Sequence, residues 1–549
     1  MKRTSRVLAI LLALAMLLSV TAFAAWDVYG GNANHNSVVT GAPTSANPSV
    51  TAIDLSNGGR GWDGVDNVPV METVGTGDDA VTYAYVLYDG YSSYGGQLAK
   101  INCSAATPYV VWRKQVSAAS GFQLSTPYLD TTNRAIYIGA SNASVYDDVA
   151  ISNPVALTAN TAGTVTINGL TLLTAANRVS VPVYVGHTSV AARGTLTTEG
   201  TATIQLGGGT AVNLTLSTTQ SSSGTTYKIY EQATYDDDGE VNGYDYYYYI
   251  NHSVTASSLT DATLSISVTL NGTGSIKSVS MFANKGAVTK ITGIDSTDAS
   301  DLTLTSVVAE VNGQINTPIT RYGDYIYFGT WSGNNPMQYY QVDVSDTDFD
   351  TVTITGNAGF YWAGAVKLGD YIYFGGDSGN LYYRSEKNFG TTGGVVALTD
   401  TENNVKASDA GNVRSTIMTD GTNLYFTSQG KYLWCYQPDA NGVPVYQWHI
   451  QLAGTSTSTP TLVQNSDGTT SIYTGYYSGF SAGGVQVTTV SGSTRTISTV
   501  ASGFPVQCSI LHSDGYIYFN TNASGGAGYC YNASTKASVW STTADTYAL

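Results

Sequence analysis

Short runs in which aliphatic or aromatic residues alternate with small and polar ones recur along most of this chain. Three of the clearest, at residues 323–329, 369–375 and 514–519, share a turn with Asp or Gly followed by an aliphatic-Tyr-Phe segment. Alternation with a period of two, bounded by turn residues, predicts β-strands with at least one buried face. The pattern therefore predicts an all-β protein.

These runs repeat at a nearly constant interval. One aliphatic or small residue marks each copy, and the markers are Ala84, Ile136, Ile326, Ile372, Leu424, Ile472 and Ile517. The last five are separated by 46, 52, 48 and 45 residues. Units of about 40 to 50 residues with four short strands are typical of propeller blades. The markers predict a seven-bladed β-propeller, whose ring is closed by either residues 50–55 or residues 538–543.

The step from Ile136 to Ile326 is 190 residues, far too long for one blade. Residues 286–291 have a pattern similar to that of residues 96–101, the third strand of the first blade. The second blade is therefore interrupted after its second strand, and residues 143–283 form a separate unit. Alternating strands about a dozen residues apart favour an inserted β-sandwich-like domain here. The propeller then consists of two parts, 25–142 and 284–549.

The N-terminus has the three parts of a secretion signal. A basic start at residues 2–6 precedes an apolar run over residues 7–20 and the small residues Ala22 and Ala24. This arrangement predicts a signal peptide at residues 1–24. The apolar run is shorter than the roughly 20 residues of a membrane-spanning helix. We expect a mature chain without a transmembrane segment, secreted and either extracellular or associated with the cell surface.

Residues 26–36, Trp-Asp-Val-Tyr-Gly-Gly-Asn-Ala-Asn-His-Asn, resemble the first segment of pyrroloquinoline-quinone-like (PQQ-like, quinoprotein-type) propeller proteins. Blades of that family carry a docking motif, Ala-x-Asp-x-x-Thr-Gly-x-x-x-Trp, whose Trp packs between neighbouring blades. Its positions are occupied here by Cys530, Asn532, Thr535, Lys536 and Trp540, so that Thr and Trp alone are identical. Trp112 and Trp448 close their blades in a similar way. The resemblance covers nearly all of the chain outside the insertion and implies the propeller fold.

In that family the quinone enzymes hold their cofactor and a calcium ion with acidic and amide side chains, and several have a disulfide between adjacent cysteines. This chain has no adjacent pair of cysteines, and no quinone or calcium ligand of the family can be matched to a position in it. The resemblance therefore implies a secreted, non-enzymatic member without a quinone cofactor. A quinone-dependent dehydrogenase is the alternative.

Charge narrows the possible partners. The net charge is −16 at pH 7, and charged residues make up 11% of the chain. Such an acidic chain argues against nucleic acid as a partner, because nucleic acid is bound by clusters of Lys and Arg. The five histidines are scattered, unlike the ligands of a transition-metal site. Acidic residues are numerous enough for a carboxylate pair, so a glycan-active enzyme remains an alternative.

The four cysteines are expected to be free. The repeat places Cys508 on the first strand of the last blade and Cys530 on the third, strands about 9.5 Å apart. A disulfide needs Cα atoms within about 7 Å of each other. Cys435 lies two blades away and Cys103 in the first blade. We expect these thiols to pack as small hydrophobic side chains.

One acidic segment has the spacing of a calcium loop. With Gly239 at the sixth position of an EF-hand-type loop, Asp236, Asp238, Asn242 and Asp245 fall at positions 3, 5, 9 and 12. Position 1 is a threonine, and both flanks alternate like strands rather than helices. We favour a hairpin turn with solvated acids. A calcium ion held by these four residues is the alternative.

Large aromatic residues are expected in loops on one face of the propeller, where the connections between blades meet the loops after the second strands. This face should carry Trp331, Tyr476, Tyr477, Phe480, Phe122 and Phe504. Exposed aromatic residues in loops indicate a surface for a ligand or a protein partner. Trp62 and Trp362, in the same connections, are expected instead to dock neighbouring blades.

Together these features predict a secreted cell-surface binding or scaffold protein rather than an enzyme. A rigid propeller would present the inserted domain and an aromatic face to an extracellular glycan or protein partner. A self-assembling surface-layer component is a further alternative, since the composition is rich in Tyr and Thr and poor in charge.

Overall fold

The computed structural model of this chain describes residues 26–42, 51, 53, 55, 65, 67–89, 96–116, 123–140, 154–172, 176–218, 227–236, 240–283, 285–331, 337–356, 359–400, 402–522 and 526–542. Nearly all of its regular structure is β-strand. The helices in this part of the chain are single turns, namely η1 (Tyr29–Gly31), η2 (Gly77–Asp79), η4 (Val190–Ala192), η5 (Ala299–Asp301) and α2 (Ala407–Ala410). None of these described helices has the length and apolar character needed to cross a membrane. The predicted signal peptide lies outside the described residues.

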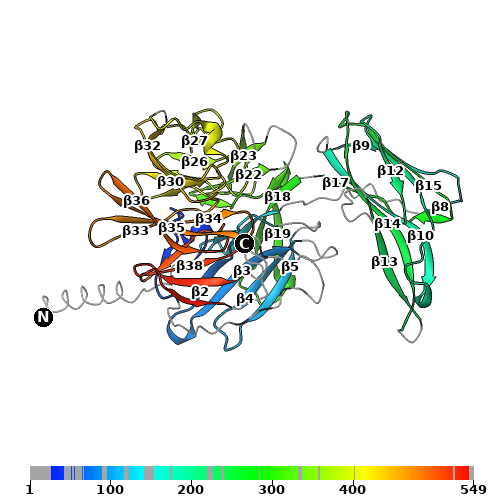
Figure 1. The fold of residues 1–549 in the computed structure, drawn as a ribbon, viewed down its shortest axis with the longest axis horizontal. Helices are drawn as coiled ribbons and strands as arrows, with labels where there is room; N and C mark the ends of the chain where they lie inside the picture. The colour runs from blue at the N-terminus through cyan, green and yellow to red at the C-terminus, as the bar shows by residue number, and fades with distance from the viewer. Residues whose placement is uncertain are drawn as a thin grey trace.

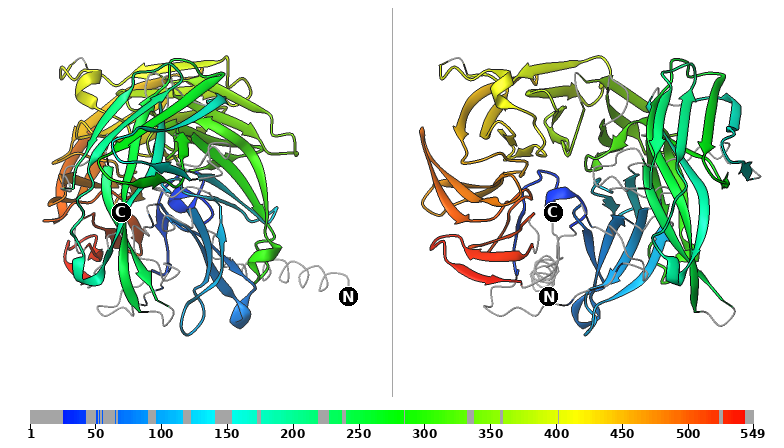
Figure 2. Two further views of the ribbon diagram at one scale, coloured as in Figure 1. Left: turned by 90° about the vertical axis from the view of Figure 1, so that its right-hand side faces the viewer. Right: turned by 45° about the vertical axis from the view of Figure 1, so that its right-hand side comes forward.

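Four-stranded antiparallel sheets follow one another around a common centre, the arrangement of a β-propeller (Figures 1 and 2). In chain order they are β2 (Val70–Val74), β3 (Val81–Asp89), β4 (Gly96–Asn102) and β5 (Tyr109–Gln115); β6 (Tyr128–Asp130), β7 (Ala135–Ala140), β18 (Lys285–Thr292) and β19 (Thr303–Asn312); β21 (Thr320–Tyr322), β22 (Tyr325–Trp331), β23 (Gln338–Asp343) and β24 (Thr351–Thr355), with β20 (Gln314–Ile315) also paired to β22; β25 (Val366–Leu368), β26 (Tyr371–Gly375), β27 (Asn380–Ser385) and β28 (Gly393–Ala397); β29 (Met418–Thr419), β30 (Leu424–Ser428), β31 (Tyr432–Pro438) and β32 (Pro444–Gln451); β33 (Thr461–Gln464), β34 (Thr470–Ser478), β35 (Ala482–Ser491) and β36 (Thr494–Ser502); and β37 (Leu511–Ser513), β38 (Tyr516–Asn520), β39 (Gly528–Asn532) and β40 (Ser538–Ser541).

The marker residues of the repeat all lie in the second strands of these sheets. In β22, the consecutive residues Ile326, Tyr327 and Phe328 are each 0% exposed, so both faces of the strand are covered. A strand buried on both faces is a continuous apolar run rather than an alternating one. The aliphatic-Tyr-Phe segments are therefore the parts of each sheet that its two neighbours enclose.

Aromatic side chains join one sheet to the next. Tyr339 of β23 stacks on Phe374 of β26, with 3.7 Å between the ring centroids. Trp112 and Trp448, each on the last strand of its sheet, also contact the neighbouring sheet. Trp112 is buried and donates Nε1 to the carbonyl of Ser296 in the next sheet at 3.1 Å. The guanidinium of Arg495 lies 4.9 Å from the ring of the buried Trp448, again across a sheet boundary.

The N-terminal segment, residues 26–39, is bonded to every one of these sheets. The bonds are Met71 N to Trp26 O (2.7 Å), Leu129 N to Asp27 O (2.8 Å), Tyr322 Oη to Ala33 O (2.8 Å), His35 Nε2 to Ala365 O (2.8 Å), Thr419 N to Asn34 O (3.1 Å), Leu462 N to Asn36 Oδ1 (2.9 Å) and His512 N to Ser37 O (2.9 Å). In Figure 2 this segment is the dark blue trace among the surrounding sheets.

Ring closure follows from the same segment. Its last residues form β1 (Val38–Val39), which pairs in parallel with β37 of the final sheet, while Trp26 bridges to Met71 of the first. The two segments that the sequence suggested for ring closure, residues 50–55 and 538–543, do not close the ring. Residues 538–541 are β40, the last strand of the final sheet, and Ile53 and Leu55 pack against the first sheet.

Between residues 154 and 283 the described strands pair only with one another and form two further sheets. One contains β13 (Tyr227–Tyr235), β14 (Val241–Thr255), β10 (Ala176–Ser189), β16 (Gly274–Ile276) and β8 (Val155–Leu157), with β17 (Ser280–Ala283) also on β10; the other contains β12 (Val212–Leu216), β11 (Gly200–Leu206), β15 (Ala262–Leu270) and β9 (Gly163–Leu170). Alternate residues of β15, including Leu264, Ile266 and Val268, are buried in a core shared by both sheets. This is the packing of two β-sheets face to face.

All four cysteines are free thiols in the structure. Cys435 is buried, and burial raises the pKa of its thiol to about 12. The placement of Cys508 on the first strand of the last sheet was wrong. That strand begins only at Leu511 and is three residues long, so Cys508 lies in the connection before it.

Candidate functional site

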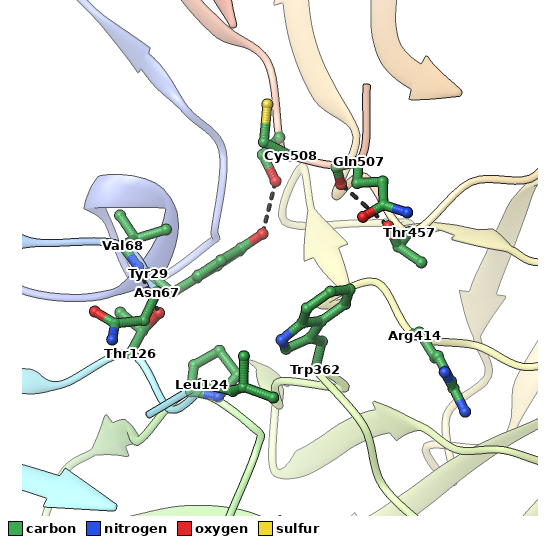
Figure 3. A pocket seen from close by; sticks show the side chains of 12 residues that line it. Tyr29, Asn67, Val68, Leu124, Thr126, Trp362, Arg414, Thr457, Gln507 and Cys508 are labelled. Atoms are coloured by element: carbon green, nitrogen blue, oxygen red, sulfur yellow. Dashed lines mark hydrogen bonds between the residues drawn. The ribbon is translucent and has the colours of Figure 1, made fainter. Parts of the chain in front are cut away.

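A cavity lies where the connections into the first strand of each propeller sheet converge (Figure 3). Every sheet contributes at least one lining residue, and the N-terminal segment adds Tyr29. The lining residues are Tyr29, Asn67, Val68, Leu124, Thr126, Pro318, Trp362, Arg414, Thr457, Gln507, Cys508 and Ser509. The cavity, here called the axial cup, has a volume of about 80 Å³, enough for several water molecules. Concave sites with a few polar groups among apolar ones are the usual places for ligands.

Tyr29 is placed in the cup by the segment that closes the ring. Its Oη lies 2.7 Å from Ser509 Oγ and 3.2 Å from Thr459 Oγ1. Burial raises the pKa of Tyr29, so the phenol stays protonated at neutral pH. The wall of the cup therefore depends on the same residues that hold the sheets together.

Arg414 lines the cup as one half of an ion pair. Its Nε and Nη2 donate to the two carboxylate oxygens of Asp377 at 2.7 and 2.6 Å, and Trp331 Nε1 donates to Asp377 at 3.0 Å. The guanidinium carbon lies 4.6 Å from the ring centroid of Tyr361. Burial opposes the charge of Arg414, but the bonds to Asp377 outweigh it and raise the Arg414 pKa. The pair is neutral as a whole, and Nη1 donates to none of the described residues.

Trp362 stands beside this pair with a strained backbone. Its φ is 56°, in the left-handed region that costs a bulky residue on the order of 1–3 kcal/mol. Its carbonyl accepts from Gly364 N at 2.9 Å, and its ring centroid lies 4.6 Å from that of Tyr361. The sequence predicted that Trp362 docks neighbouring blades. In the structure it lines the cup, and its carbonyl also accepts from Thr416 Oγ1, in the connection into the next sheet, at 3.4 Å. Strain held in this way is typical of functional sites.

Two amide side chains present unpaired polar atoms at the cup. Asn67 Nδ2 donates to two backbone carbonyls at 2.7 and 2.6 Å, while its buried Oδ1 accepts from none of the described residues. Gln507 Oε1 accepts from Asn522 at 2.8 Å, and no described residue accepts from its Nε2. With Arg414 Nη1, the lining residues have two donors and one acceptor without a partner among the described residues. A ligand rich in hydroxyl groups both donates and accepts, and so matches this set.

Two of the six aromatic residues predicted at a ligand surface lie beside the cup. Trp331 bonds Asp377, as described above. Tyr477 lies close enough to Arg414 to interact electrostatically with it, and its Oη accepts from Gln429 Nε2 at 3.2 Å. Both residues are therefore near the Arg414–Asp377 pair, and neither lines the cup.

The other predicted aromatic residues are not brought together there. Tyr476 is partly buried beside Gly454, and Phe480 is 75% exposed in the turn between β34 and β35. Phe504 stacks on Tyr529 with 4.6 Å between centroids and so joins the last two sheets. Phe122 and Trp62 lie outside the described residues.

The acidic segment considered for calcium is a hairpin between β13 and β14. Asp236 Oδ1 accepts a backbone N–H of the turn at 2.9 Å, and Asn242 Oδ1 accepts a threonine hydroxyl at 2.7 Å. Asp245 lies on β14 with its carboxylate 3.1 Å from His187 Nδ1. Asp238 lies outside the described residues. In the described part of the chain no three His, Cys, Asp or Glu residues gather as a metal site.

The calcium ion of the quinoprotein enzymes does not fit the cup. The carboxylate beside it, Asp377, is already bonded by Arg414 and Trp331. Calcium requires several oxygen ligands, and the described lining supplies no second carboxylate.

Residues 479–483 have the Gly-x-Ser-x-Gly spacing of a hydrolase nucleophile. In the structure they form the turn between β34 and β35 and the start of β35. A nucleophile elbow requires a strand followed by a helix. Ser481 is therefore a turn residue here.

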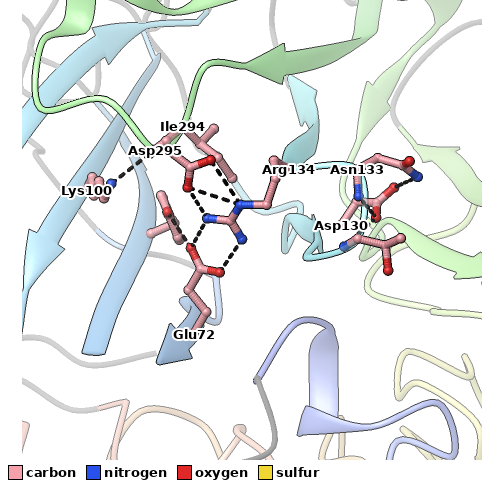
Figure 4. Close-up of polar contacts among 9 residues, drawn as sticks. Glu72, Lys100, Asp130, Asn133, Arg134, Ile294 and Asp295 are labelled. Atoms are coloured by element: carbon pink, nitrogen blue, oxygen red, sulfur yellow. Dashed lines mark hydrogen bonds and ion pairs between the residues drawn. The ribbon is translucent and has the colours of Figure 1, made fainter. Parts of the chain in front are cut away.

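A second arginine cluster lies between the first two sheets (Figure 4). Arg134 Nη1 and Nη2 donate to the two oxygens of Glu72 at 2.5 and 2.9 Å, and its Nε donates to Asp295 at 3.0 Å. Tyr85 Oη donates to Glu72 at 2.8 Å. The bonds from Arg134 lower the pKa of Asp295. Nearby, burial lowers the pKa of Lys100, whose Nζ donates to a backbone carbonyl at 2.7 Å.

The polar residues of the cup were missed from the sequence. Asn67, Arg414 and Gln507 each precede a first strand by a few residues, and Asp377 follows β26. A usable signal was available, because aligning the repeats on their first strands brings Arg414 and Gln507 into one column, four residues before the strand, with Asn67 in the next column. The prediction from the sequence instead placed the ligand surface in the loops after the second strands, because large aromatic residues occur there.

No protein-family model matches this chain, and a search of curated proteins found no match. Among solved structures, the chain is similar to a europium-containing methanol dehydrogenase, with 9% identity over 96% of this chain and 87% of that one (TM-score 0.43). It is similar to BamB from Moraxella catarrhalis, with 16% identity over 42% of this chain and 66% of that one (TM-score 0.31). It is also similar to a mutant of the NanB sialidase from Streptococcus pneumoniae, with 12% identity over 73% and 64% (TM-score 0.31). The chain thus spans about two thirds of BamB and of the sialidase.

Proposed function

We propose that this chain is a secreted, non-enzymatic binding protein whose axial cup holds the end of an uncharged extracellular glycan. In this proposal the propeller has seven blades of the PQQ-like type, formed by residues 25–142 and 284–549. A β-sandwich domain at residues 143–283 interrupts the second blade and extends the protein toward further partners. The observation that carries the proposal is that every propeller sheet contributes to one cup.

The charge of the cup supports an uncharged ligand. Its cation, Arg414, is neutralised by Asp377 through two short bonds. Among the described residues, Arg414 Nη1 and Gln507 Nε2 have no acceptor, and Asn67 Oδ1 has no donor. Hydroxyl groups satisfy donors and acceptors alike, and the rings of Trp362 and Tyr29 offer surface to the apolar face of a sugar.

The same geometry favours binding over glycoside hydrolysis. Hydrolysis uses two carboxyl groups on opposite sides of the bond to be cleaved. Asp377 is the carboxylate next to the described lining, and its oxygens are engaged by Arg414 and Trp331. A held glycan would therefore stay intact, which release of reducing ends measures directly.

The test is a glycan array and cell-wall pulldown with the mature chain, residues 25–549. A Trp362→Gly variant probes the cup, and a variant with a short linker in place of residues 143–283 probes the inserted domain. We expect an uncharged glycan to bind the mature chain and the linker variant but not the Trp362→Gly variant. Binding that survives Trp362→Gly would contradict the proposal, as would cleavage of the bound glycan.

A further inference from the structure

One face of the sheet formed by β10, β14 and β13 carries a row of tyrosines. Tyr246 and Tyr248 of β14 are buried in the core between the two sheets, so the residues between them point outward. Tyr247 pairs in register with Tyr184 on one side and Tyr230 on the other. Their ring centroids are 5.6 and 6.3 Å apart. Figure 1 shows the three strands side by side.

These rings are open to solvent. Tyr230 is 54% exposed, and Tyr249, in the next row along β14, is 37% exposed. The register places further outward residues in the adjacent rows, namely Pro182, Asn251, Gln232, Asp245 and His187. Tyrosine, amide and hydroxyl groups dominate these described positions, and branched aliphatic side chains do not occur at them. The centre of a protein interface is usually more apolar than this.

Two cations lie beside the tyrosine row on this face. One carboxylate, Asp245, also lies there, 3.1 Å from His187 Nδ1. Arg178 and Lys277 are exposed and form no ion pair with the described residues, and Lys277 Nζ lies 5.1 Å from the ring centroid of Tyr184. The chain as a whole has a net charge of −16. The two cations beside the tyrosine row therefore give this part of an otherwise acidic chain positive charges that attract anionic groups.

The face is long enough for a polymer. Arg178 and Tyr184 are six residues apart on β10, a distance of about 20 Å in a strand. Three neighbouring strands add a width of about 10 Å. Such a surface accommodates several sugar units, whereas the axial cup admits only the end of a chain.

We propose that this surface, the tyrosine face (Tyr184, Tyr230, Tyr247 and Tyr249 with Arg178 and Lys277), binds an anionic polysaccharide. The rings stack against the sugar units, and the two cations pair with the acidic groups of the polymer. The site lies within residues 143–283 and does not depend on the cup.

The test is affinity electrophoresis and calorimetry of the mature chain with three polymers: polygalacturonate, poly(glycerol phosphate) and uncharged dextran. We expect binding to one or both polyanions, weakened by added salt because the charges are exposed. Dextran should not bind the Trp362→Gly variant, in which the cup no longer holds the end of an uncharged glycan, so the comparison of dextran with the polyanions is made on that variant. The two polyanions distinguish carboxylate groups from phosphate groups as the anion recognised.

Variants assign the binding to the face. Tyr230→Ala should weaken binding of the better polyanion about tenfold, the scale of one lost aromatic contact. Replacing Arg178 and Lys277 by Ala should remove most of the salt dependence. Tyr235→Ala is the matched control, since this tyrosine is 62% exposed on the same strand but outside the row. Trp362→Gly should leave polyanion binding unchanged, which separates this site from the cup.

Three results would overturn the proposal. The first is equal binding of dextran and the polyanions. The second is a loss with Tyr235→Ala as large as with Tyr230→Ala. The third is binding of neither polyanion by the folded mature chain, which would make a protein the better candidate partner for this face.

Discussion

The propeller contains two arginine clusters that look alike as ion pairs and differ in their surroundings. Arg134 is shared between two carboxylates, Glu72 and Asp295, and its cluster fills the space between two sheets. Arg414 has a single carboxylate, Asp377, and stands beside a cavity, a strained tryptophan and unpaired amide atoms. In our proposal, the atoms left without partners among the described residues, rather than the ion pair, distinguish the binding site from the structural contact.

The largest contrast should come from the tryptophan beside each cluster. Trp112 is 4% exposed and donates to Ser296 across the first sheet boundary, so Trp112→Ala should cost about 3–5 kcal/mol of unfolding free energy. Trp362→Gly should change stability by less than about 1 kcal/mol, because glycine adopts a φ of 56° without strain and offsets the lost contacts. Glycan binding in the cup should be lost in this second variant alone.

Tryptophan fluorescence during urea unfolding measures the first quantity. All eight tryptophans lie outside residues 143–283, so the signal reports the propeller and not the inserted strands. Equal destabilisation by the two substitutions would mean that Trp362 is a docking residue, as the sequence suggested.

The next effect concerns the carboxylate of the structural cluster. Glu72 is 5% exposed and accepts from Arg134 and Tyr85, so Glu72→Ala leaves a partly buried guanidinium without its main partner. Removing one member of a buried pair costs about 3 kcal/mol. The matched control is Asp295→Ala, because Asp295 bonds the same arginine but is 62% exposed and should cost less than about 1 kcal/mol. Urea unfolding followed by tryptophan fluorescence compares the two, and a larger loss for Asp295→Ala would reverse our assignment.

A smaller effect is expected at the carboxylate of the cup. Asp377→Asn keeps an oxygen for Trp331 but removes the charge that neutralises Arg414. Stability should fall by about 2 kcal/mol, the scale of a hydrogen bond to a charged group, while affinity for an uncharged glycan should fall about tenfold. Calorimetry should also show improved binding of glycans that end in a carboxylate. If the preference for uncharged ligands persists, then the ion pair does not set the selectivity of the cup.

The strands could be predicted from the sequence because their physical cause is local. Each aliphatic-Tyr-Phe segment, such as Ile326-Tyr327-Phe328, is enclosed by its two neighbouring sheets, and the repeat records that burial at a regular interval. Closure of the ring has no comparable signal. It depends on two residues, Val38 and Val39, in a parallel pairing with a strand more than 470 residues away, and on backbone bonds that any sequence can make.

The cup was harder to predict for a related reason. Trp331 was predicted at a ligand surface because a large aromatic residue at the end of a strand is conspicuous by itself. Arg414 and Asp377 are 37 residues apart, on different sheets, and become partners only when those sheets pack side by side. Trp362 was predicted to dock blades from its residue type, and its place in the lining of the cup depends on a backbone angle that the sequence does not reveal. Residue types thus predict the structure well where burial of side chains determines it. They predict it less well at a site that several connections form together.

The smallest expected effect is the response of the structural cluster to acid. The bonds from Arg134 lower the pKa of Asp295 below its ordinary value of 3.8. A carboxyl group with a lowered folded-state pKa contributes stability above its unfolded pKa, and that contribution is lost as the pH falls through the folded value. Because Asp295 is 62% exposed, solvent screening should keep the contribution below about 1 kcal/mol. Unfolding followed by tryptophan fluorescence between pH 6 and pH 3 should therefore show a slightly shallower loss of stability below about pH 4 for Asp295→Asn than for the parent chain. Identical slopes would mean that Glu72 alone holds Arg134, and the two arginine clusters would then each rest on a single carboxylate.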